Sequence, residues 1–113
     1  MENNLQFEIL KYKNFQMIDD LEKTIEFLKN GDFQSAETKK LTNSNYFRAK
    51  INYKDRLVFT FLKYQEKSYI ALLETIINHD YNKSQFLRDK KIEESDFNFE
   101  TIVLVQQEVG KHQ

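Results

Sequence analysis

The chain has 113 residues, a formal net charge of −1, ten phenylalanines and six tyrosines. This length suits one domain with a modest core, and the aromatic content excludes an intrinsically disordered chain. The absence of cysteine excludes disulfide frameworks, thiol nucleophiles and thiolate metal sites, and it fits a reducing compartment, so we expect a cytoplasmic protein. The longest apolar run, YIALLETII, is too short to span a bilayer, and the N-terminus lacks the pattern of a leader, so we expect no membrane contact.

The first expected element is a strand within LQFEILKY, residues 5–12. Leu5, Phe7 and Ile9 alternate with Gln6, Glu8 and Leu10, and a period of two is typical of a half-buried strand.

A helical hairpin is expected next. In FQMIDDLEKTIEFLKNG, apolar residues recur at helical spacing at Phe15, Ile18, Leu21, Ile25 and Leu28. Asn14 is the expected cap of this helix, and Asn30-Gly31 its expected end. The segment DFQSAETKKL then offers Asp32 as the cap of a second, shorter helix that would pair with the first.

Three strands are expected in quick succession, in YFRAKINY, RLVFTFLKY and SYIALLETII. The short polar links around Lys54-Asp55 and around residues 65–67 predict an antiparallel meander. The third strand is apolar on both of its alternating sets, so we expect it in the interior of the sheet.

The expected fold class is therefore α+β: the N-terminal strand and the three-strand meander form one four-stranded antiparallel sheet, and the helical hairpin lies on it. Residues 1–90 form the expected domain, and residues 91–113 form a C-terminal extension. In the extension, FETIVLVQQEV has valines typical of a strand and a length that also permits a helix, so its structure stays open.

Charge is unevenly distributed along the chain. Between Lys39 and Tyr64 seven basic residues face one acid, Asp55, for a sum of about +6, whereas residues 1–38 and residues 92–113 each sum to about −4. A basic middle of this kind is suited to binding phosphate. In FRAKI, the period of two sends Arg48 and Lys50 to the face opposite Phe47, Ala49 and Ile51.

The order of these elements, from about residue 5 to about residue 88, resembles the RelE/ParE-like toxin superfamily. The segment YFRAKINYKDRLVFTF looks like that family's basic strand, turn and second strand. The segment INHDYNKSQF is similar to the one in which that family has the last of its site residues along the chain. The resemblance implies a toxin of a toxin–antitoxin system that cleaves messenger RNA, in a ribosome-dependent way, and blocks translation. It also implies a cognate antitoxin as partner, with messenger RNA and the ribosome as targets. The RNA's own 2′-hydroxyl would be the nucleophile, so no metal and no cofactor are expected.

By this resemblance, five residues would be catalytic: Arg48, Lys50, Arg56, His79 and Tyr81. The three cations would bind the phosphate and stabilise the charge that develops on it, while His79 and Tyr81 would transfer protons or stack on a base. Lys54 and Lys83 would add contacts to the RNA phosphates.

Simpler interpretations apply to the same residues. Alternating Arg48 and Lys50 also suit the solvated face of a sheet, and His79 at a strand end is often structural. Tyr81 and Phe86 also suit lids over a core. Two other functions stay open: a non-catalytic RelE-like module for protein interaction, and a ParE-type gyrase inhibitor.

Overall fold

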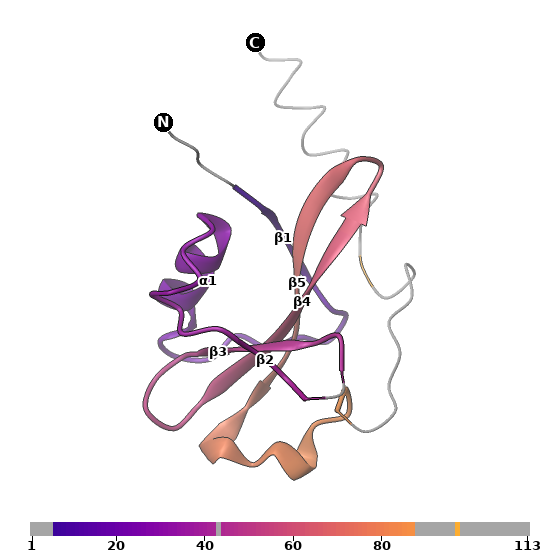
Figure 1. Cartoon of the computed structure of the whole chain (residues 1–113). Helices are drawn as coiled ribbons and strands as arrows, with labels where there is room; N and C mark the ends of the chain where they lie inside the picture. Colours follow the sequence, from indigo (N-terminus) through magenta and orange to yellow (C-terminus); the bar gives the residue numbers. More distant parts are fainter. Residues whose placement is uncertain (1–5, 43, 88–96, 98–113) are drawn as a thin grey trace.

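The computed structural model of the protein describes residues 6–42, 44–87 and 97. In this part of the chain one helix, α1 (Leu21–Lys29), packs against a five-stranded sheet of order β1-β5-β4-β3-β2 (Figure 1). The strands are β1 (Glu8–Lys11), β2 (Lys39–Lys40), β3 (Phe47–Lys50), β4 (Arg56–Tyr64) and β5 (Lys67–Ile76). Two single 3₁₀ turns follow β5, at Ile77–His79 and Tyr81–Lys83. The α+β class is confirmed.

The meander of β3, β4 and β5 is antiparallel, as its short links predict. β5 lies between β4 and β1, which explains why both of its faces are apolar. β1 pairs with β5 in parallel, from Glu8 opposite Tyr69 to Lys11 opposite Leu72, so the expectation of a wholly antiparallel sheet is wrong and the sheet is mixed. The expected four-stranded sheet gains a fifth strand because Lys39 and Lys40 pair with Arg48 and Phe47 of β3.

The helix side of the sheet carries one hydrophobic core. Its buried members come from α1, from alternating positions of the sheet and from the segments that follow α1 and β3: Leu21, Leu28, Ala36, Ala49, Ile51, Leu57, Phe59, Ile70 and Leu72. The side chain of Thr24 anchors the helix to the sheet, since its hydroxyl donates a hydrogen bond of 2.8 Å to the carbonyl of Lys50. The end of β3 is thereby fixed against α1.

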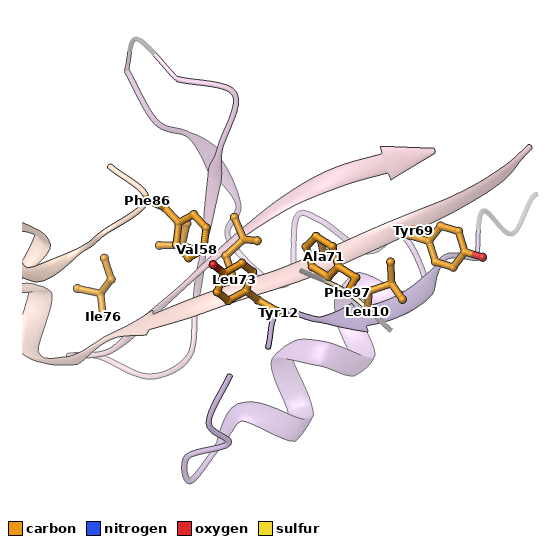
Figure 2. Packing of buried hydrophobic residues seen from close by; sticks show 9 residues of the cluster. All are labelled: Leu10, Tyr12, Val58, Tyr69, Ala71, Leu73, Ile76, Phe86 and Phe97. Atoms are coloured by element: carbon orange, nitrogen blue, oxygen red, sulfur yellow. The ribbon is translucent and has the colours of Figure 1, made fainter. Parts of the chain in front are cut away.

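A second core fills the opposite face. Figure 2 shows Tyr12 and Leu73 beside Val58 and Phe86, with Ala71, Leu10 and Phe97 grouped along the sheet. The rings of Tyr12 and Phe86 meet edge to face with centroids 4.9 Å apart. Between Val58 and Phe59 the register with β5 shifts by one residue, so Leu73 adds an extra side chain here. Residues that follow β5 therefore close the second face.

The first helix is shorter than its apolar spacing predicts. Asn14 does not cap it: Asn14 has φ 69° and lies in a turn closed by a hydrogen bond from Phe15 N to the Tyr12 carbonyl. Asp20 is also left-handed, with φ 72°, so the helix begins only at Leu21. The predicted end is confirmed, because Gly31 takes φ 74° and Asp32 N bonds back to the Phe27 carbonyl.

The predicted second helix is wrong. Asp32 does accept a hydrogen bond from Ser35 N at its Oδ1, as a cap should, but only one turn forms. Glu37 then takes a left-handed φ of 51°, and the Thr38 amide and hydroxyl both bond to the Phe33 carbonyl. Lys39 and Lys40 continue into β2 instead. By pairing with β3, the backbone groups of these two lysines gain the hydrogen bonds that a second helical turn would have supplied.

Of the expected C-terminal extension, only Phe97 is among the described residues; the others in residues 91–113 lie outside them. Phe97 is 7% exposed and its ring centroid lies 5.9 Å from that of Tyr12. This residue therefore packs in the second core. The expected boundary at residue 90, between the domain and its extension, stays a prediction.

Candidate functional site

Three of the predicted cations share one end and one face of the sheet. Lys50 of β3 lies directly opposite Arg56 of β4 in the antiparallel register, and Arg48 lies two positions along on the same face. Phe47, Ala49 and Ile51 belong to the helix-side core, as the alternation predicts. The sheet therefore brings Arg48, Lys50 and Arg56 together as a basic cluster, which we call the cation row.

Glu37 partly balances the cation row. Its carboxylate lies 3.6 Å from Lys50 Nζ, and its carbonyl accepts a hydrogen bond of 3.3 Å from Arg48 Nη1. Both side chains of the ion pair are substantially exposed, so the pair contributes little stability and an anion in solution can compete for Lys50. Glu37, which the sequence placed in the expected second helix, is thus an acid in direct contact with two of these cations.

Arg56 holds the turn between β3 and β4. Its Nη1 donates hydrogen bonds to the carbonyls of Asn52, at 2.7 Å, and Asp55, at 3.0 Å. Within the described part of the chain, these bonds engage only Nη1 of the guanidinium. Since arginine has five N–H donors, the Nε and Nη2 donors of a fixed guanidinium are left for another acceptor.

The turn from Asn52 to Asp55 is organised by its own side chains. Asn52 Oδ1 accepts hydrogen bonds from the amides of Lys54, at 2.9 Å, and Asp55, at 2.8 Å. Asp55 is 6% exposed, and its carboxylate accepts hydrogen bonds from Asn52 Nδ2 and from the Asn78 amide. The sequence places Asp55 in this polar link and shows its charge, but it gives its carboxylate no partner. The Asn-x-x-Asp spacing in NYKD is the local signal that indicates its turn role.

His79 contacts this turn by two groups. Its amide donates to the Lys54 carbonyl at 3.0 Å, and its Nε2 lies 3.1 Å from the Tyr53 carbonyl. Asn78 and His79 both take left-handed φ values, 56° and 59°, so the chain bends sharply after β5 to make these contacts. Lys54 and His79 are therefore neighbours, at the end of the sheet where Arg56 begins β4.

Tyr81 and Lys83 are less closely associated with the cation row. Tyr81 is half-buried and packs against the second core, which matches the simpler interpretation of this residue as a lid. Lys83 is exposed, and its Nζ lies 3.6 Å from a carboxylate oxygen of Asp80. Among the described residues, no hydrogen bond or ion pair joins the side chains of any two of the seven predicted site residues.

Two hollows flank the cation row. A groove of about 570 Å³ lies between the start of α1, the Ser35–Glu37 turn and the end of β3, and Lys50 and Asn52 line it. A second hollow, of about 280 Å³, lies between the end of β5 and the 3₁₀ turns, with Asp80 and Lys83 on its wall. The groove beside Lys50 has charged side chains on both walls and suits a charged group, whereas the second hollow has a mixed lining that includes Ile76 and Ile77.

The resolved pKa shifts fall outside the cation row. Burial raises the pKa of the Tyr46 phenol, and burial together with Glu8 and Tyr64 raises the pKa of Tyr69. Both tyrosines belong to the second core or its margin, so their phenols stay protonated at neutral pH and serve packing.

Searches of the described residues find no group of three or more His, Cys, Asp and Glu side chains able to hold a metal ion. No helix in the described part of the chain is long and apolar enough to cross a membrane. Comparisons of the chain with family models, with curated proteins and with solved structures returned no match.

Proposed function

We propose that this chain is a RelE/ParE-like toxin that binds messenger RNA through the cation row and cleaves it without a metal ion, in a ribosome-dependent way and in the cytoplasm. Inhibition by a cognate antitoxin belongs to the same proposal. The RNA 2′-hydroxyl would attack the adjacent phosphorus, leaving a 2′,3′-cyclic phosphate on one product and a 5′-hydroxyl on the other.

The observation that carries the proposal is the placement of His79 against the turn that Arg56 holds. Arg56 and His79 lie far apart in the sequence, but both donate to carbonyls of residues 52–55. A proton acceptor and a charge stabiliser are thus fixed relative to one backbone segment. Such preorganisation is what general base catalysis with phosphate stabilisation needs.

The contact of His79 with Tyr53 also supports a proton-accepting role. A carbonyl oxygen only accepts hydrogen bonds, so Nε2 at 3.1 Å must carry the proton. In the neutral ring Nδ1 then holds the lone pair, and it can take the proton of an RNA 2′-hydroxyl.

The test is cleavage of an end-labelled RNA in a cell-free translation system, with primer extension to map the new ends. We expect His79→Ala to lower the cleavage rate about 10²- to 10⁴-fold, the usual contribution of a general base. Arg48→Ala with Lys50→Ala should weaken RNA binding, and that loss should shrink at high salt.

Lys63→Ala is the matched control, because Lys63 is exposed on the far end of β4, away from Arg56. It removes one positive charge and should leave cleavage unchanged. A 2′-deoxy substitution at the mapped cut site should abolish cleavage. Cleavage that survives that substitution, or that survives His79→Ala, would refute the proposed chemistry.

A second candidate function is a non-catalytic binding module. The same contacts favour it, since Arg56 Nη1 and His79 Nε2 are already bonded within the protein and Tyr81 packs on the core. Intact message, with RNA or a protein retained on the cation row in a pull-down, would favour this function over cleavage.

A further inference from the structure

Tyr53, at the tip of the turn between β3 and β4, is unusually exposed. Its side chain is 81% exposed, compared with 44% or less for the other exposed large hydrophobic residues of the described chain. Within that part of the chain, the ring makes no hydrogen bond and no contact with another ring. The ring therefore contributes nothing visible to the stability of this domain.

The backbone that carries Tyr53 is nevertheless firmly held. Asn52 Oδ1 bonds the two amides that follow Tyr53, and the Tyr53 carbonyl accepts from His79. The Ile51 amide closes the turn on the Asp55 carbonyl at 3.0 Å. An aromatic ring on a fixed backbone loses little conformational entropy when it binds a ligand.

Two cations adjoin Tyr53 in this turn, while the carboxylate of Asp20 reaches the turn from the start of α1, where it accepts a hydrogen bond of 3.4 Å from Asn52 Nδ2. Lys54 follows it in the chain, and the guanidinium of Arg56 bonds to the carbonyl that precedes it. The one acid of the turn, Asp55, is buried, so its carboxylate does not face a ligand over the turn. An exposed aromatic ring beside several cations matches single-stranded nucleic acid, in which phosphates and unpaired bases alternate.

We propose that Tyr53 stacks on an unpaired base of a single-stranded RNA whose phosphates contact Lys54 and the cation row. This inference rests on the proposed function for the class of ligand, and it does not require cleavage. A base in a duplex is covered on both faces by its neighbours, so the stacking contact selects unpaired RNA.

The chain contains no tryptophan, which allows a direct test. Tyr53→Trp introduces a single tryptophan, whose emission can be excited apart from that of the tyrosines and should be quenched when a base stacks on it. Met17→Trp is the matched control: Met17 is also exposed, at 44%, and lies in the loop before α1. The probe is a 2′-O-methyl oligoadenylate of about 12 nucleotides, which binds as single-stranded RNA but lacks the 2′-hydroxyl nucleophile.

We expect the probe to quench Tyr53→Trp and to leave Met17→Trp unchanged. In fluorescence anisotropy, Tyr53→Ala should weaken binding about five- to 100-fold, which corresponds to the loss of one stacked base, while Tyr53→Phe should bind like the native chain. The same sequence as a duplex should neither quench nor respond to Tyr53→Ala.

The outcomes separate this inference from the proposed function. Equal binding by Tyr53→Ala and the native chain would overturn the stacking role, even if the native chain cleaves RNA; Tyr53 would then be available for a protein contact. Binding that depends on Tyr53 without any cleavage of unmodified RNA would support stacking and refute the nuclease. No binding of the probe by the native chain would overturn the stacking role, whereas the nuclease is decided separately by cleavage of the end-labelled RNA in the translation system.

Discussion

Replacement of Asp55 tests whether the turn between β3 and β4 is as firmly held as its contacts indicate. Its carboxylate accepts hydrogen bonds of 3.1 Å from Asn52 Nδ2 and 3.0 Å from the Asn78 amide, in a site that is 6% exposed. A hydrogen bond to a charged group contributes about 1.5–3 kcal/mol, and an unsatisfied buried donor costs about 1–3 kcal/mol. Because Asn52 can recover water contacts, we expect Asp55→Ala to lower the free energy of unfolding by about 2–4 kcal/mol.

Asp55→Asn should have a smaller effect, about 1–2 kcal/mol. The amide oxygen can still accept from the Asn78 amide, but the new amide NH₂ would face the NH₂ of Asn52. Rotation of the Asn52 side chain cannot relieve this clash, because its Oδ1 is needed by the amides of Lys54 and Asp55.

Urea denaturation followed by circular dichroism measures both changes. Asp80→Ala is the control, because Asp80 is also an acid of this region, and toward the described residues its side chain forms only a largely exposed ion pair with Lys83. Its loss should cost less than about 0.5 kcal/mol. If Asp55→Ala lowers stability no more than Asp80→Ala does, the turn is not held by the Asp55 carboxylate and the argument for a fixed site fails.

Three further predictions concern the two cores. Phe86→Ala should lower the free energy of unfolding by about 3–5 kcal/mol, because Phe86 is 3% exposed against Tyr12; a loss below about 1 kcal/mol in urea denaturation would contradict the second core. Thr24→Val keeps the side-chain shape but loses the bond to the Lys50 carbonyl, so it should cost about 1 kcal/mol, and an unchanged denaturation midpoint would exclude this anchor. The raised pKa of Tyr69 means that the unfolded chain releases this proton at lower pH, so stability should fall as pH rises above about 10; Tyr69→Phe should reduce that fall, measured by denaturation between about pH 9 and pH 11.

The meander could be predicted from the sequence because its strands are rich in strand-forming residues and because polar residues mark where each strand ends. RLVFTFLKY matches β4 from end to end, since apolar β-branched and aromatic residues fill the run and polar residues bound it. SYIALLETII is apolar on both faces, and β5 is indeed flanked by β1 and β4. These signals are local, so no knowledge of the rest of the fold was needed.

The failures involve elements whose structure depends on distant partners. Lys39 and Lys40 carry no strand signal of their own, and β2 forms because the edge of β3 is available to pair. Asn14 and Asp20 suit helix caps by type, but both take left-handed conformations while Phe15 and Ile18 still pack on the helix-side core. The apolar spacing therefore predicted what is buried and overestimated the length of the helix.

For the candidate site, alternation along β3 was enough to place Arg48 and Lys50 on one face. The contacts of Arg56 and His79 with the turn could not be predicted, because they depend on how the segment after β5 meets residues 52–55. Tyr53 was overlooked for a related reason: the sequence shows an aromatic residue in a turn, but only the fold shows that the ring is left exposed.

The parallel pairing of β1 with β5 has a consequence for the order of folding. The meander forms through short links, whereas Glu8 must meet Tyr69 across most of the domain. Closing so long a loop before the meander exists would cost chain entropy, and no hydrogen bonds to a sheet edge would compensate for that cost. During synthesis, β1 leaves the ribosome first and yet must wait for β5, so the earliest strand in the chain is expected to be the last to dock. Until then the edge of β5 is open, and a strand from another molecule could occupy it.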